Sequence, residues 1–135
     1  MRKLIHLILT SVLIGFALLS IQCQKKSVEQ LQIEGDYQID TEYIAGELNI
    51  KRLSVNKISF SVATVTKHPG QHTAAIDGEA TISGNVASFQ NTEDASCKLT
   101  IIFTPNQAVI KGADSNCRTY MGAAAVLDGI YKKMK

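Results

Sequence analysis

Most of the short motifs that enzymes use are missing from this sequence. It contains no Gly-x-Ser-x-Gly nucleophile elbow, no glycine-rich phosphate loop and no Cys-x-x-Cys pair. After residue 22 its histidines are only His68 and His72, so few side chains could act as a base beside a nucleophile. We therefore predict that the protein is not an enzyme and that it requires no cofactor.

Tryptophan is also absent, and beyond the first few residues neither charge sign is in excess. Arg2 and Lys3 account for the formal net charge of +2, and the basic and acidic residues that follow are equal in number and mixed along the chain. Without a basic stripe, we predict no nucleic-acid partner. The 113 residues from Cys23 onward are enough for one domain and too few for two.

The long apolar run lies at the N-terminus. Arg2 and Lys3 precede an apolar segment from Leu4 to Ile21, an arrangement that is typical of an export signal. A retained transmembrane helix is the alternative, because about eighteen residues are near the lower limit for crossing a bilayer. A cysteine closes the run, which favours a lipoprotein-type signal peptide over residues 1–22.

Cys23 lies where this leader meets polar sequence, at the position that lipoprotein processing acylates and turns into the new N-terminus. The preceding residues, 19–22, resemble a relaxed lipobox, although Gln22 stands where the usual pattern has Gly, Ala or Ser. We predict lipidation of Cys23, followed by a tether over residues 23–34, which are polar and have no clear period. The alternatives are a free or intermolecular thiol, or loss of Cys23 with the leader.

Cys97 and Cys117 are the two remaining cysteines. An exported protein meets an oxidising compartment, where an even set of cysteines is expected to pair. A disulfide between them would close a loop of about twenty residues and stabilise a small domain by roughly 3 kcal/mol. A reactive thiol is the alternative, but neither cysteine has a second cysteine at redox spacing or a cluster of histidines beside it.

From residue 35 onward, apolar and polar residues alternate. Residues 72–82, HTAAIDGEATI, have mostly apolar side chains at even positions and mostly polar ones at odd positions, as in a strand half-buried in an antiparallel sheet. In residues 97–103, CKLTIIF, Cys97 shares its parity with three apolar residues and is predicted on the core face. The other predicted strands are residues 35–39, 47–53, 57–66, 85–90, 107–111 and about 124–132. This pattern predicts an all-β domain over residues 35–135, a small antiparallel β-barrel or sandwich of about eight strands.

The segments between these strands have the composition of turns. Ser83-Gly84-Asn85 can supply the positive φ of a tight turn, and Pro105-Asn106 fits the centre of a type I turn. Helical periodicity is absent after the leader, apart from residues 121–127, MGAAAVL, which could form either a short helix or an apolar strand.

The domain begins with EGDYQI and ends with DGIYKK, so that an acidic residue, a glycine and a tyrosine recur near both ends. We expect the first and last strands to pair, because pairing them removes both free edges of the sheet. Tyr37 and Tyr131 are predicted to be structural aromatics at this junction rather than ligand contacts.

Two groups of polar residues could in principle support chemistry. His68 and His72 are four apart, but Pro69-Gly70 between them predicts a turn, so we interpret them as solvated loop residues and predict no metal site. The carboxylates expected on strand exteriors or in loops would keep ordinary pKa values and make poor general acids; they are Asp77, Glu79, Glu93, Asp94 and Asp128.

A lipobox-like cysteine, an all-β domain, two late cysteines and the closing DGIYKK strand together resemble the small lipid-anchored or periplasmic β-proteins of bacteria. Within that group the periplasmic lysozyme inhibitors are similar in size and architecture. That resemblance implies a binding loop of the Ser-Gly-x-x-Tyr type, to which only Ser83 and Gly84 correspond, because the expected tyrosine is absent.

These observations lead to one principal hypothesis about function. We expect a lipoprotein of the bacterial cell envelope, held on the membrane by its N-terminal lipid or periplasmic if unlipidated, that acts as a non-enzymatic binding or envelope-interaction module. A lysozyme inhibitor and a lipocalin-like carrier of a small apolar ligand are the alternatives, since eight strands can enclose one small ligand.

Overall fold

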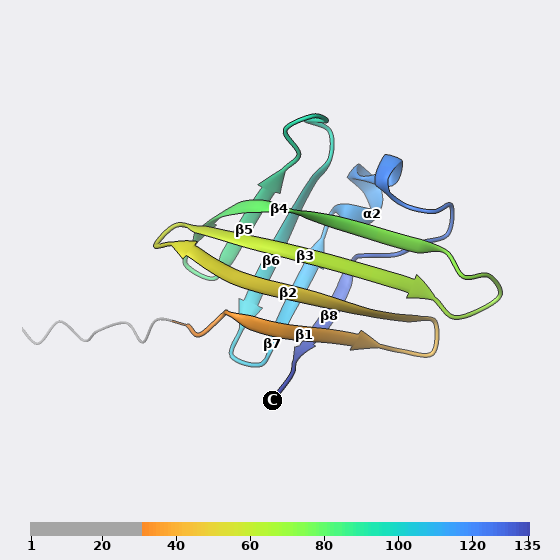
Figure 1. Cartoon of the computed structure of the whole chain (residues 1–135), viewed down its shortest axis with the longest axis horizontal. Coiled ribbons are helices and arrows are strands. Elements are labelled where there is room, and N and C mark those ends of the chain that lie inside the picture. Colours follow the sequence, from red (N-terminus) through yellow and green to blue (C-terminus); the bar gives the residue numbers. More distant parts are fainter. Residues whose placement is uncertain (1–30) are drawn as a thin grey trace, which may run out of the picture. The chain divides into compact units, whose positions relative to one another are not determined.

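The computed structural model describes residues 31–135, and these form one compact unit. Eight antiparallel strands follow each other around a closed barrel in chain order. They are β1 (Gly35–Asp40), β2 (Ile44–Ser54), β3 (Lys57–Thr66), β4 (Thr73–Ser83), β5 (Val86–Gln90), β6 (Lys98–Thr104), β7 (Gln107–Lys111) and β8 (Gly129–Lys133). The all-β prediction is confirmed, and of the two predicted architectures the structure has the barrel (Figure 1).

The barrel closes where β1 pairs with β8, as the repeated glycine-tyrosine pattern predicts. Tyr37 lies opposite Lys133 and Gln38 lies opposite Lys132. Both strand tyrosines are fully buried, and each hydroxyl donates a hydrogen bond to the carbonyl four residues earlier: Tyr37 to Ile33 and Tyr131 to Leu127, both at 2.7 Å. The two ends of the domain are therefore fastened in the same way.

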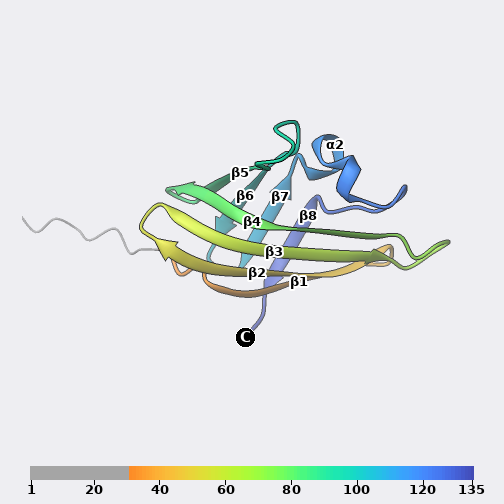
Figure 2. The same cartoon turned by 45° about the horizontal axis from the view of Figure 1, so that its top comes forward.

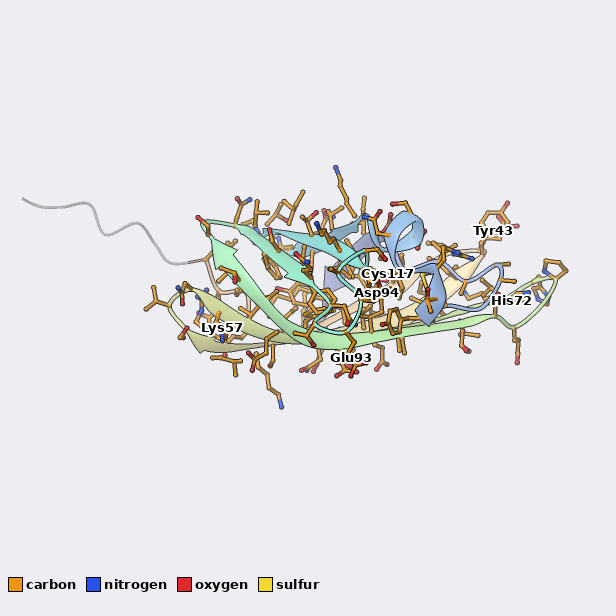
Figure 3. The ribbon with its side chains drawn as sticks, turned by 90° about the horizontal axis from the view of Figure 1, so that it is seen from above. Tyr43, Lys57, His72, Glu93, Asp94 and Cys117 are labelled. Atoms are coloured by element: carbon orange, nitrogen blue, oxygen red, sulfur yellow. A yellow bond between two sulfur atoms is a disulfide. The ribbon has the colours of Figure 1, made fainter. Side chains whose placement is uncertain are left out.

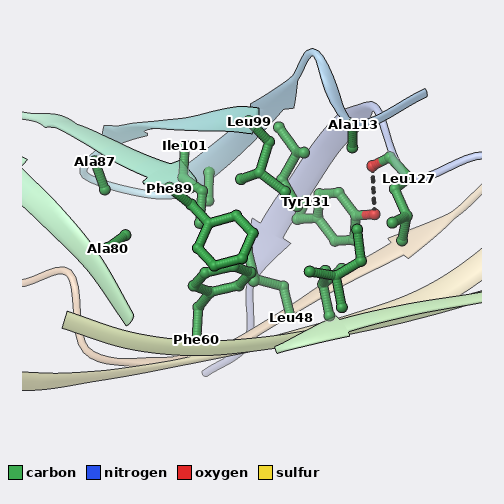
Figure 4. Close-up of a cluster of buried hydrophobic side chains, with 14 of the residues drawn as sticks. Leu48, Phe60, Ala80, Ala87, Phe89, Leu99, Ile101, Ala113, Leu127 and Tyr131 are labelled. Atoms are coloured by element: carbon green, nitrogen blue, oxygen red, sulfur yellow. Dashed lines mark hydrogen bonds between the residues drawn. The ribbon is translucent and has the colours of Figure 1, made fainter. Parts of the chain in front are cut away.

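Alternation along the strands puts one set of side chains inside. In β4 the even residues Ala74, Ile76, Ala80 and Ile82 are buried, and the intervening odd residues are exposed. Phe60 and Phe89 meet edge to face in the interior with ring centroids 5.0 Å apart (Figure 4). Because large side chains from all eight strands occupy the interior, the outer wall is the better place to look for a binding site.

The compact unit extends further toward the N-terminus than residue 35. Ile33 is buried in the core and accepts the Tyr37 hydrogen bond, and Leu31 packs against the same cluster. Residues 31–34, which belong to the predicted tether, are thus in contact with the barrel.

Residues 112–128 connect β7 to β8, and we call them the cap segment; the sequence prediction is wrong for their second half, residues 121–128. The cap segment contains a short helix, α2 (Ala113–Asn116), a 3-10 turn, η1 (Arg118–Tyr120), and an irregular stretch. The last strand begins at Gly129 and not near residue 124, so residues 121–127 form neither the helix nor the strand considered above. Figures 1 and 2 show the cap segment beside one end of the barrel.

Side chains that bond to backbone atoms explain the irregular stretch. The Arg118 guanidinium donates to the carbonyls of Gly122, Ala123 and Ala125 at 2.5–3.1 Å. These three carbonyls are therefore satisfied without a neighbouring strand. Ala125 and Leu127 turn into the core and close this end of the barrel.

Candidate functional site

A groove lies on the outer wall where β4 separates from β5. β4 pairs with β3 at nine positions but with β5 at only three, Thr81–Ser83 opposite Val86–Ser88. The two pairs that would follow, Ala80 with Phe89 and Glu79 with Gln90, are not formed. Glu79, Phe89 and Gln90 instead line a groove of about 670 Å³, which we call the outer groove. Its existence follows from unequal strand lengths, eleven residues in β4 and five in β5.

Polar and charged side chains surround the outer groove. It is lined by β4, β5, β6, the end of β7 and α2; the lining residues are Glu79, Thr81, Ser88, Phe89, Gln90, Lys98, Leu99, Thr100, Lys111, Gly112 and Asn116. Lys98 and Lys111 contribute two positive charges against the single negative charge of Glu79. Hydroxyl and amide groups supply both donors and acceptors. This combination suits a ligand with carboxylate or carbonyl oxygens.

Between the outer groove and the start of β4, the side of β4 that faces away from β3 has no strand partner within residues 31–135; we call it the free edge. Thr73 at the start of β4 accepts a hydrogen bond from Gly122 N at 2.9 Å, on the side of β4 that faces away from β3. Alternate residues of a strand direct their backbone groups the same way, so Ala75, Asp77 and Glu79 point their N–H and C=O groups to this side as well. Within residues 31–135 no strand pairs with β4 there between Ala75 and Ala80.

Gly78 allows Phe89 to fill the gap behind this edge. A β-carbon at residue 78 would lie 2.6 Å from Cε2 of the Phe89 ring, which is closer than real contacts of this kind. The ring thus seals the barrel interior where the two strands diverge, and it forms part of the groove wall. A glycine within an alternating strand is a sequence signal for such a close approach.

The cap segment is fixed beside the groove by a reciprocal pair of carboxylates. Asp128 accepts the N–H groups of Gly112, Ala113 and Asp114 at 2.8–3.4 Å. Asp114 in turn accepts those of Leu127 and Asp128 at 2.6 and 3.2 Å. The sequence prediction treated Asp128 as a solvated carboxylate, whereas the structure gives it this backbone-binding role.

The predicted cysteine pair joins the cap segment to β6. Cys97 and Cys117 are both fully buried, and their sulfur atoms are 2.10 Å apart. Asn116, beside the disulfide, donates from Nδ2 to the Lys98 carbonyl at 3.0 Å. The disulfide and this hydrogen bond together hold α2 at the rim of the outer groove.

Within residues 31–135, the pKa values of three groups are displaced from their ordinary values. Burial raises the pKa of Tyr131, and the negative charges of Asp114 and Asp128 raise it further. Burial also raises the pKa of Tyr37. Hydrogen bonds from the Ser96 hydroxyl and backbone lower the pKa of Asp94. These shifts stabilise the neutral tyrosines and the ionised aspartate, so each is explained by the fold itself.

The remaining residues singled out in the sequence do not meet at one place. Ser83 and Gly84 lie at the β4–β5 turn, where Gly84 has φ of 62° and no atom lies near the position of its missing β-carbon. His68 is exposed, while His72 is half-buried and its backbone bonds to Thr66. Residues 31–135 contain no group of three metal-binding side chains. Cys23 and the predicted signal peptide lie outside the described residues.

The exposed carboxylates are distributed over different parts of the wall. Asp77 lies on the free edge of β4, Glu79 in the outer groove, and Glu93 in the β5–β6 connection with its backbone N–H bonded to Asn91. In the described part of the chain no helix is long and apolar enough to span a bilayer. Comparisons with protein-family models, curated protein sequences and solved structures found no match.

Proposed function

We propose that this protein is an extracytoplasmic lipoprotein that binds a partner on its outer wall without chemical conversion. The observation that carries the proposal is the separation of β4 from β5, which leaves a free strand edge that leads into a polar groove. An extended segment of a partner can pair with such an edge through main-chain hydrogen bonds, while groove side chains select its residues. Lys98 and Lys111 favour a segment with acidic or carbonyl groups.

Two other features support the extracytoplasmic part of the proposal. A buried disulfide is typical of proteins that fold in an oxidising compartment. The apolar leader that ends at Cys23 is typical of a lipoprotein signal. Mass spectrometry of the mature N-terminus tests this part: we expect an acylated peptide that begins at Cys23, and an unmodified peptide that begins beyond residue 23 would contradict it.

A proline substitution at one position, residue 77, tests binding at the free edge. The N–H of Asp77 points away from β3, so Asp77→Pro removes a donor that the barrel does not use, whereas Asp77→Ala keeps that donor and removes only the carboxylate. Native mass spectrometry of protein purified from its own host should show a bound partner for the natural chain and for Asp77→Ala, and its loss for Asp77→Pro. Equal retention by both variants would exclude pairing at this edge.

The groove has its own charge-reversal test. Lys98→Glu should weaken binding of the partner recovered in the first experiment, because it places a negative charge in the groove. Lys132→Glu on β8 makes the same charge change away from the groove and serves as the control. If no partner is retained by the natural chain, the binding function is not supported.

A further inference from the structure

The turn between β2 and β3 differs in its chemistry from the β4–β5 and β6–β7 turns at the same end of the barrel. Glycine and asparagine form the β4–β5 turn, and proline and asparagine form the β6–β7 turn, as turn preferences predict. The β2–β3 turn instead has Val55 beside Asn56. Val55 is 86% exposed and Leu53 is 50% exposed, so the barrel itself gains little from either apolar side chain.

Basic residues surround these two apolar side chains. Residues 51–57, KRLSVNK, which we call the tip hairpin, contain Lys51, Arg52 and Lys57 and no acidic residue. The Arg52 guanidinium donates from Nη1 to the Val55 carbonyl at 3.0 Å, so its positive charge is held at the turn. Lys57 pairs with Glu79 at 3.2 Å, and both side chains are more than half exposed, so that solvent screens the pair.

The opposite ends of the strands have the other charge sign. The connections there, residues 41–43, 67–72, 91–97 and 112–128, contain five acidic and two basic residues. Figure 3 shows Lys57 of the tip hairpin and Tyr43 of the first of these connections at opposite ends of the barrel. The tip hairpin is therefore positive and apolar, with Glu34 as an acidic neighbour, whereas the connections at the other end are predominantly negative.

The chain reaches the barrel next to the tip hairpin. Glu34 accepts the backbone N–H of Arg52 at 2.9 Å, which places residues 31–34 beside it. Eight peptide units separate Cys23 from Leu31, and a fully extended chain of that length spans at most about 29 Å. An acyl chain on Cys23 would thus hold this end of the barrel within about one bilayer thickness of the membrane surface.

We propose that the tip hairpin docks on an anionic lipid surface, with Leu53 and Val55 entering the interface and the basic residues facing lipid headgroups. This proposal rests on the lipid anchor proposed above. The anchor holds the chain at the membrane surface, and the tip hairpin adds a second contact that combines apolar insertion with attraction to anionic headgroups. A lipid surface fits better than a protein partner, because two apolar side chains among positive charges are too small an area for a specific protein interface. Each basic residue near an anionic membrane strengthens attachment about fivefold.

The absence of tryptophan provides a clean assay, because one introduced indole is the only one in the chain. Val55→Trp reports on the tip hairpin, and Tyr43→Trp, at a site that is 68% exposed at the opposite end, is the matched control. The processed full-length variants are incorporated into phosphatidylglycerol-containing vesicles whose acyl chains carry bromine, which quenches a nearby indole. Equal thermal midpoints and circular dichroism spectra establish that both variants are folded.

We expect at least threefold stronger quenching of Val55→Trp than of Tyr43→Trp, with a blue-shifted emission that weakens at high salt. Lys51→Glu added to Val55→Trp should reduce the quenching, whereas Lys111→Glu should not. If an acylated chain floats with the vesicles while both reporters are quenched equally, the docking proposal is overturned and the anchor stands. If the chain proves unacylated, the anchor is overturned, and the same reporters mixed with anionic vesicles still decide docking by whether Val55→Trp alone is quenched.

Discussion

Replacement of Tyr131 by phenylalanine tests how the cap segment is attached to the barrel. The substitution keeps the ring in the core and removes only the hydroxyl, which donates to the Leu127 carbonyl at 2.7 Å (Figure 4). A buried carbonyl that loses its donor costs about 1–3 kcal/mol. We therefore expect Tyr131→Phe to lower the free energy of unfolding by about that amount at pH 7.

Alkaline pH should reverse part of this difference. Burial, followed by the charges of Asp114 and Asp128, raises the pKa of Tyr131 in the folded state above its ordinary value near 10. The unfolded chain therefore releases this proton first, and the stabilisation that is complete below about pH 10 is lost as the pH rises. The loss is about 1.4 kcal/mol per pH unit for one proton. The Tyr131→Phe variant has no hydroxyl at residue 131 to ionise, so it does not undergo this loss of stability. The stability curves of the natural chain and the variant should therefore converge between about pH 10 and pH 11.5.

Urea unfolding followed by circular dichroism at several pH values measures both effects. Tyr43→Phe is the control for loss of a tyrosine hydroxyl: its side chain is 68% exposed, and we expect the stability at pH 7 to be unchanged. Parallel curves for the natural chain and Tyr131→Phe across pH 10–11.5 would refute the reasoning, because they would show that the hydroxyl titrates alike in the folded and unfolded states.

Three further substitutions test the packing around the site. Asp128→Ala removes an acceptor shared by three backbone N–H groups and should cost about 2–4 kcal/mol in urea unfolding, whereas Asp128→Asn keeps one acceptor oxygen and should cost less. Gly78→Ala should cost about 1–3 kcal/mol through its clash with the Phe89 ring, and Phe89→Leu in the same chain should recover part of it; additive losses would contradict the clash. Cys97→Ala with Cys117→Ala should lower the free energy of unfolding by about 3 kcal/mol, and an unchanged midpoint would show that the crosslink is unimportant.

The strands and the barrel closure could be predicted because local patterns determine them. Alternation in residues 72–82 indicates which face of β4 is buried, and the parity of Cys97 with its apolar neighbours predicts its burial. The tyrosine near each end of the domain indicates how β1 and β8 meet. The alternation and the cysteine parity lie within a few consecutive residues, and the closure signal is a short motif that recurs at the two ends of the domain, so each can be read from the sequence.

The cap segment could not be predicted, because contacts between residues far apart in the chain determine its conformation. Asp114 and Asp128 exchange backbone hydrogen bonds across the segment, and Arg118 binds three carbonyls of an alanine-rich stretch that has no period of its own. Local propensity therefore favoured a helix or a strand for residues 121–127. The outer groove was closer to being predictable, since the unequal lengths of the strands before and after Gly84 were already visible.

The positions of the outer groove and the tip hairpin constrain each other. Glu79 lines the groove and pairs with Lys57 of the tip hairpin, so one wall of the groove begins at the end of the barrel that we propose to lie on the membrane. Asn116 and Lys98, on the other side, are held by α2 and the start of β6 near the acidic end. A partner segment in the groove would then run away from the bilayer toward water. The positive residues of the groove, Lys98 and Lys111, would lie beyond the lipid headgroups. Tip docking and partner binding could therefore occur together, and charge reversal at Lys51 should weaken the first without affecting the second.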